Sequence, residues 1–234
     1  MNKLFVFARR RATLERGEYW AAWRAAVSAL LNEGPGRAVS RCVENRAIAG
    51  ASVPEMTLSP FDGATELWFP EPEELAAALG DDAWRGALEA IAAEFAAPGT
   101  TIVLAAEESV QFDRGFGAVK FMALSCRAAS FATRDEWIRY WVEVHGPMAH
   151  GIPEFTRYYG RYVHNYILPS EHATGGLEPE FDGIVEEWVE SVDSFAQCLA
   201  EPRYLETVRP DELRFVDFSR SHVLLAEEHV VLER

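Results

Sequence analysis

The chain of 234 residues contains an internal repeat, in which two segments match each other about 120 positions apart. Residues 41–45, RCVEN, return as residues 161–165, RYVHN, and residues 61–68, FDGATELW, return as residues 181–188, FDGIVEEW. All six histidines lie in the second copy. Because the fold is duplicated and the histidines are not, the sequence predicts one functional site in the second copy and none in the first.

Composition excludes several classes of protein. The formal charge of −15 would repel phosphate backbones and anionic lipid headgroups, so neither nucleic acid nor membrane is an expected partner. No apolar run approaches the ~20 residues needed to span a membrane, and the N-terminal apolar stretch is too short for a signal peptide. The three cysteines are scattered and form no CxxC pair, which favours a reducing cytoplasm over a disulfide framework.

Each copy shows the same succession of predicted elements. In the second copy, strands are expected over residues 120–127, 161–168, 182–189 and 223–231. Helices are expected after Thr133, where Glu136 completes a capping box, and over residues 193–199, with Gly146-Pro147 breaking the first helix. The order β-α-β-β-α-β is that of a ferredoxin-like unit, whose sheet has helices on one face and an uncovered apolar face on the other.

Two such sheets from one chain can cover each other, as in a two-fold dimer. The predicted fold class is therefore α+β, with two tandem ferredoxin-like repeats packed sheet to sheet as a pseudo-dimeric barrel. The predicted repeats cover residues 1–113 and 118–234, and residues 111–119 form the linker. The partner of each repeat is the other repeat, and a further homodimer stays open.

The sequence Tyr140-Trp141-x-x-x-His145-Gly146-Pro147, followed by the Phe-Asp-Gly strand, resembles the EthD family of dimeric α+β barrel proteins. The resemblance implies a barrel fold and a catabolic or polyketide setting. The first copy departs from the pattern at an offset of 117, because Ser28 matches His145, Arg24 matches Trp141 and no Gly-Pro follows. Any site is therefore expected in the second copy.

His145 is the leading catalytic candidate. It shares a helical face with Trp137 and Trp141, which places a polar ring in an aromatic-lined cleft suited to proton transfer. The alternative is a histidine stabilised by the end of a helix, or a satisfied core group.

His164 lies on a predicted strand between Tyr162 and Tyr166, and alternation puts all three side chains on one face. The first copy has Glu44 at the position of His164. If this face turns toward the helices, His164 and His145 form an acid–base pair; if it turns elsewhere, the stripe is packing. Both interpretations stay open.

Residues identical in both copies, among them Glu186 and Trp188, are more economically structural. Glu186 is retained as a third catalytic candidate, because a sheet carboxylate beside a histidine can orient it. No metal site is predicted, since His145 and His150 are five residues apart and no paired-ligand motif appears. Haem binding occurs in distant relatives of the fold, but no feature of the sequence requires it, so no cofactor is expected.

The sequence has no phosphate-binding loop, serine elbow or nucleophilic cysteine motif. The remaining chemistry is proton transfer on an apolar, aromatic or polyketide-like small molecule. The leading hypothesis is a cofactor-independent lyase, dehydratase or cyclase. Its expected substrate-binding residues are Tyr140, Trp141, Tyr162, Tyr166 and Trp188. The alternatives are a cofactor-free monooxygenase and a non-catalytic binding protein.

Overall fold

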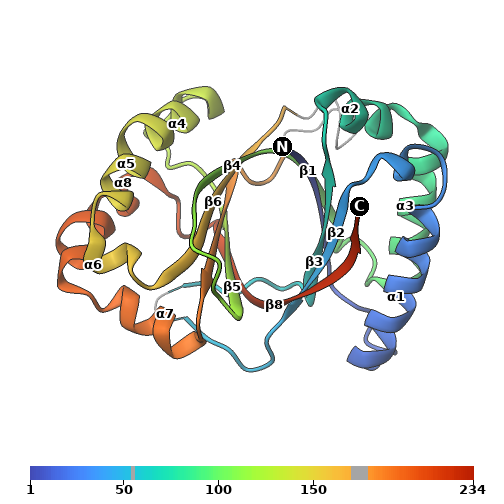
Figure 1. Ribbon diagram of the computed structural model, residues 1–234, viewed down its shortest axis with the longest axis horizontal. Helices are drawn as coiled ribbons and strands as arrows, with labels where there is room; N and C mark the ends of the chain where they lie inside the picture. Colours follow the sequence, from blue (N-terminus) through green and yellow to red (C-terminus); the bar gives the residue numbers. More distant parts are fainter. Residues whose placement is uncertain (54–55, 170–178) are drawn as a thin grey trace.

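The computed structural model describes residues 1–53, 56–169 and 179–234, and its centre is a closed antiparallel barrel of eight strands (Figure 1). The order around the barrel is β1-β3-β2-β8-β5-β7-β6-β4. The first half contributes β1 (Asn2–Ala8), β2 (Arg41–Ala47), β3 (Gly63–Phe69) and β4 (Ile102–Asp113). The second half contributes β5 (Val119–Ser125), β6 (Tyr159–Ile167), β7 (Gly183–Val189) and β8 (His222–Glu233).

Two seams close the barrel, and both join one half of the chain to the other. At one seam β2 pairs with β8, and at the other β4 pairs with β6. Closure leaves neither half with a free sheet edge at its seams, which removes a common route to aggregation. The predicted barrel between the two halves is confirmed.

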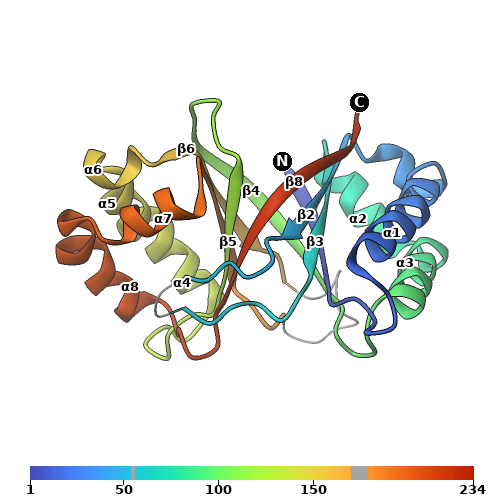
Figure 2. The ribbon, with the colours of Figure 1, turned by 90° about the horizontal axis from the view of Figure 1, so that it is seen from below.

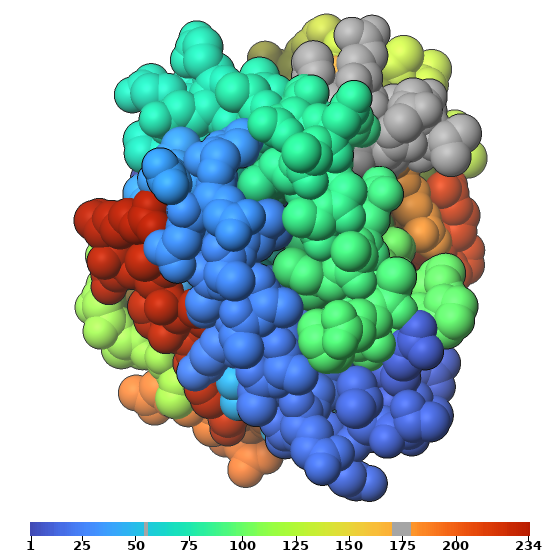
Figure 3. All heavy atoms as spheres, turned by 90° about the vertical axis from the view of Figure 1, so that its right-hand side faces the viewer, coloured from blue at the N-terminus to red at the C-terminus, as the bar shows by residue number. Residues whose placement is uncertain are grey.

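Helices cover the barrel on two opposite sides (Figures 1 and 2). Over the first half lie α1 (Arg16–Leu30), the 3₁₀ turn η1 (Gly34–Ala38), α2 (Pro72–Gly80) and α3 (Asp82–Phe95). Figure 3 shows α1 and α3 side by side on the outer face of this half. Over the second half lie α4 (Arg134–Tyr140), α5 (Gly146–His150), α6 (Pro153–Thr156), α7 (Val192–Leu199) and α8 (Arg209–Phe215), with π-helical turns η2 (Trp141–His145) and η3 (Tyr204–Val208).

Strand alternation divides the core into an inner and an outer part. Strands of both halves contribute to an apolar cluster that fills one part of the barrel interior. It includes Phe5, Phe7, Met122 and Leu124. The alternate residues pack outward under the helices of their own half. The sequence predicted apolar inner faces. The structure differs from this prediction, because charged side chains occupy another part of the interior.

Several local predictions differ from the structure. Helices α3 and α8 were not expected from the sequence, although Asp81 caps α3 through the amide of Trp84. Gly146-Pro147 does not end the helical path, because proline is tolerated in the first turn of a helix and α5 begins there. The linker is shorter than predicted, since β4 continues to Asp113, paired with Arg161 of β6. Among the described residues, no helix is long and apolar enough to cross a membrane.

Candidate functional site

A cavity lies between the outer face of the second half's sheet and its helices, and it opens to solvent at its mouth. Its wall is mostly apolar and aromatic, with Phe121, Trp141, Tyr162 and Phe215 among the lining residues. The first half also contributes to the wall through Met56 and Thr57, in the chain between β2 and β3. The predicted pocket of the second copy is therefore present, and both halves form it.

Two π-helical turns present residues to this cavity. In η2 the amide of Gly146 donates to the carbonyl of Trp141, five residues back. In η3 the amide of Arg209 donates to the carbonyl of Tyr204 at the same spacing. A π turn inserts one residue into a helix and changes which side chains face inward, and such turns are frequent at functional sites. Trp141 and His145 from η2 and Tyr204 from η3 all line the cavity.

His145 is held by a carboxylate. Its Nδ1 lies 2.9 Å from Oδ2 of Asp211 on α8, and its ring stacks on Phe215 with centroids 4.8 Å apart. The hydroxyl of Tyr140 donates to the other oxygen of Asp211. These hydrogen bonds, first that of His145, lower the pKa of Asp211, so the carboxylate is ionised.

An ionised Asp211 that accepts from Nδ1–H selects the tautomer of His145 whose Nε2 carries the lone pair. The histidine is 6% exposed and lines the cavity. A carboxylate on one ring nitrogen and a basic second nitrogen at an apolar pocket is the arrangement of a general base.

His164 occupies a different environment from His145. It is 1% exposed and packs against Trp141, with ring centroids 4.4 Å apart, and it does not line the cavity. Its Nδ1 is 3.3 Å from the hydroxyl of Tyr166, and its Nε2 has no hydrogen-bond partner among the described residues. Burial, followed by the neighbouring His150, holds the pKa of His164 well below its usual value.

The other histidine beside His164 is His150, and their ring centroids are 5.3 Å apart. Burial lowers the pKa of His150 to about 4. The tyrosine stripe faces the helices, as one of the two sequence hypotheses requires. However, Trp141 packs on the ring of His164, and only His145 of the two opens into the cavity.

The five expected substrate-binding residues fall into three groups. Trp141 and Tyr162 line the cavity. Tyr140 bonds Asp211 and Tyr166 contacts His164, so these two lie one layer away from the cavity. Trp188 points into the barrel, where its indole N–H donates to Glu228 over 2.8 Å.

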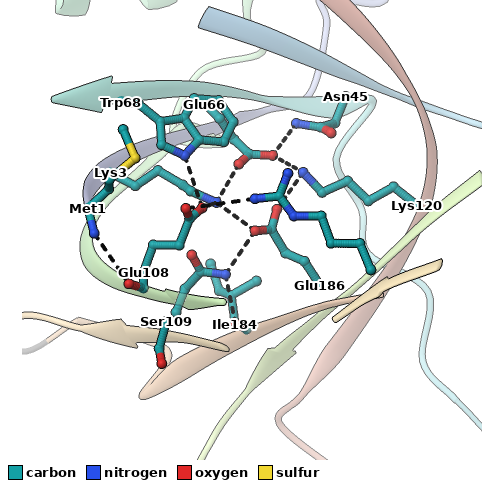
Figure 4. Close-up of polar contacts among 12 residues, drawn as sticks. Met1, Lys3, Asn45, Glu66, Trp68, Glu108, Ser109, Lys120, Ile184 and Glu186 are labelled. Atoms are coloured by element: carbon teal, nitrogen blue, oxygen red, sulfur yellow. Dashed lines mark hydrogen bonds and ion pairs between the residues drawn. The ribbon is translucent and has the colours of Figure 1, made fainter. Parts of the chain in front are cut away.

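Glu186 also points into the barrel, on the opposite face of β7 from the cavity, and belongs to an ionic cluster (Figure 4). The Nζ of Lys3 lies 2.6 Å from Glu186, 2.8 Å from Glu66 and 2.7 Å from Glu108. Lys120 contacts Glu66, Glu186 and Glu228 in the matching arrangement. The structure thus separates Glu186 from the predicted histidines.

Nearly every member of this ionic cluster has its counterpart in the other copy. Asn45 donates to Glu66 over 2.6 Å, and Asn165 donates to Glu186 over 2.9 Å. Burial lowers the pKa of Lys3, but the surrounding carboxylates raise it by more. The buried lysine therefore remains charged. The paired arrangement explains why both copies carry these residues.

Sequence reasoning missed two carboxylates of the site, Asp211, which bonds His145, and Glu187, which lines the cavity. Asp211 lies on α8, which was not predicted, and Glu187 on β7 was passed over for its neighbour Glu186. At an offset of 120, Asp211 corresponds to Ile91 of the first copy and Glu187 corresponds to Leu67. These mismatches are the signal that could have found both residues.

The site was also tested for a metal or haem. Among the described residues, no group of three or more potential ligands could hold a metal, and His172 lies outside those residues. Haem carries two propionates that favour cationic partners. The described lining contains Glu187 and Glu212 but no lysine or arginine, so its residues do not fit haem.

Comparison with solved structures places the fold in the dimeric α+β barrel class. An anthrone oxidase-like protein aligns with a TM-score of 0.61 at 9% identity, covering 98% of this chain and 92% of its own. A mutant chlorite dismutase from Candidatus Nitrospira defluvii gives 0.54 at 12% identity, covering 98% and 92%. A protein from Fusobacterium nucleatum, provisionally described as a monooxygenase, gives 0.52 at 7% identity, covering 98% and 91%.

No curated protein matches the sequence at a significant level. The EthD domain model matches the chain twice, over residues 11–99 and 131–219. These two matches correspond to the two halves of the barrel, as the internal repeat requires. The chain belongs to the EthD domain family and carries the domain as a tandem duplication.

Proposed function

We propose that this protein is a cofactor-free monooxygenase acting on an enolisable, polycyclic aromatic small molecule in the cavity of the second half. The observation that carries the proposal is the Asp211–His145 pair, which presents a basic nitrogen to an aromatic-lined cavity. The apolar wall keeps water away from the carbanion, so that solvent does not reprotonate it before it meets oxygen.

The reaction balances without an added cofactor. Nε2 of His145 removes a proton from a methylene group flanked by aromatic rings, and the carbanion adds O₂ to form a peroxide. Loss of the second C–H proton and cleavage of the O–O bond give a ketone and water, so that R₂CH₂ + O₂ becomes R₂C=O + H₂O. Asp211 stabilises the imidazolium that exists between the two proton transfers.

The names of the structural relatives favour this reaction over the lyase, dehydratase or cyclase expected from the sequence. An anthrone oxidase-like protein and a provisional monooxygenase share the fold. Because the sequence identity is so low, these names suggest a first substrate to test and do not assign the activity. Anthrone has the required methylene between two aromatic rings.

The test is oxygen consumption with anthrone, measured with an oxygen electrode and corrected for oxidation without protein. The proposal expects one O₂ consumed per anthraquinone formed, and a loss of about 10³-fold in kcat for His145→Ala. Turnover without oxygen uptake would favour the lyase class. Binding without turnover would favour a non-catalytic binding protein.

Three further assignments accompany this proposal. We infer that each half is a ferredoxin-like repeat, over residues 1–113 and 118–234, which the strand order β4-β1-β3-β2 and its counterpart β8-β5-β7-β6 support. The three buried free thiols fit a cytoplasmic location. A further homodimer would be tested by light scattering.

A further inference from the structure

The cavity holds a second ionisable group that the proposed base does not use. Glu187 on β7 is 5% exposed and lines the cavity, between Phe121 of β5 and Tyr162 of β6 in the strand register. In the part of the chain that the structure describes, no lysine, arginine or histidine forms an ion pair with it. A carboxyl group in such a wall calls for a hydrogen-bonding explanation.

Two further buried groups, the phenol of Tyr159 and the thiol of Cys198, lie close to Glu187. The buried thiol of Cys198 on α7 donates to the hydroxyl oxygen of Tyr159 over 3.1 Å. The hydroxyl of Tyr159 also acts on Glu187, because it lowers the pKa of that carboxyl group against the larger effect of burial.

The surroundings keep Glu187 in its neutral form. Burial, followed by the nearby carboxylate of Glu212, raises the pKa of Glu187 well above its usual value. Glu212 is itself held by Arg209, 3.2 Å away, and by the hydroxyl of Tyr204 over 2.8 Å. A neutral Glu187 has one O–H donor at the wall of the cavity.

We propose that Glu187 is the hydrogen-bond donor that recognises a carbonyl oxygen on the substrate, so that the cavity selects aromatic ketones over aromatic hydrocarbons. The ligand-binding part stands on the position of Glu187, which is buried, lines the cavity and has no ion-pair partner among the described residues. The catalytic part rests on the proposed function: as His145 removes a proton, negative charge develops on the carbonyl oxygen, and a preorganised donor stabilises it.

The first half supplies a natural comparison, because it lacks all three of these polar groups. At an offset of 120, Leu67 replaces Glu187, Val39 replaces Tyr159 and Ala78 replaces Cys198. All three replacements are apolar and buried. Leucine is thus accommodated at this position of the fold, which makes Glu187→Leu a suitable variant.

The experiment measures binding of 9-fluorenone and of fluorene, its analogue without the carbonyl, and records the infrared carbonyl stretch of bound ¹³C-labelled fluorenone. We expect a downward shift in the wild-type protein, retained in Glu187→Gln, whose amide still donates. In Glu187→Leu the shift disappears and affinity for fluorenone falls about tenfold, while affinity for fluorene does not fall.

An unshifted carbonyl in the wild-type protein, or equal affinity for the two compounds, would overturn the proposal, and so would failure to bind either. Circular dichroism of each variant verifies folding. Because the readout needs no turnover, a positive binding result beside an absent oxygen uptake would reject the monooxygenase and keep the recognition site.

Discussion

The two halves place different chemistry at the same position between helix and sheet. In the first half Glu44 is held by Arg24 and Arg46, each with a nitrogen 2.7 Å from its carboxylate. The matching residues of the second half are His164, Trp141 and Tyr166, which form an aromatic cluster. The three charged side chains form an ionic lock in the first half, whereas aromatic rings take their place in the second, and Trp141 among them lines the cavity.

The helices over the two halves differ in the same sense. In the first half α1 and α3 are regular, and Tyr19, Trp20 and Trp23 of α1 fill the space above the sheet. In the second half both counterparts contain a π-helical turn that presents residues to the cavity. The shared residues build the barrel and its ionic cluster, and the divergent ones build the site.

The largest expected effect follows from giving the second half the residues of the first. His145→Ser and Asp211→Ile should each lower kcat for anthrone oxidation by about 10²–10⁴-fold, because general-base catalysis is lost. The double variant should lose little more, since the two residues act as a unit. Oxygen uptake measures this, with Ser28→Ala as the control; a large effect of the control would break the distinction between the halves.

The ionic cluster should respond equally in the two halves. Glu66→Gln and Glu186→Gln should each lower the free energy of unfolding by about 3 kcal/mol, because a buried lysine loses part of its compensation. Urea unfolding measures both values. If Glu186→Gln abolishes activity while Glu66→Gln does not, the carboxylate of β7 has a catalytic role and the symmetry argument fails.

The buried histidines make stability depend on pH. His150 stays neutral in the folded state down to a pH of about 4, and burial holds the pKa of His164 well below its usual value, whereas an unfolded histidine is protonated below about 6.5. Unfolding therefore takes up protons in this window, and stability falls as the pH decreases. His164→Phe should reduce the slope by up to about 1.4 kcal/mol per pH unit below about pH 6.5. An unchanged slope in urea titrations would show that His164 is protonated in the folded protein.

The smallest effect is expected at the ionic lock of the first half. Glu44→Gln should lower the free energy of unfolding by about 1 kcal/mol, because Arg24 is 38% exposed and regains solvent. Oxygen uptake should not change. A marked loss of activity would mean that the first half also carries a site.

Much of the fold followed from the sequence, because periodicity and the repeat act together. Offsets of 117 and 120 tied each strand of one half to a strand of the other, and the Thr133 cap marked the start of α4, where its hydroxyl accepts from the amide of Glu136. The structure differs in one detail of that cap, since the side chain of Glu136 accepts from Ala132.

The candidate site was predictable only in part. The mismatch between Ser28 and His145 identified a residue that lines the cavity, and comparing positions 67 and 91 with 187 and 211 would have added two carboxylates. The pairing of His145 was not predictable. Its partner Asp211 is 66 residues away, on a helix with weak sequence signals.

The sequence by itself determined that the chain folds as two matching halves, and that the histidines gather in the second, because both are properties of residue order. Only the tertiary structure decided which face each side chain takes. Glu186 and Glu187 are neighbours in the chain, yet one joins two lysines inside the barrel and the other lines the cavity. The physical reason is the two-residue period of a strand, whose direction is set by packing against distant elements.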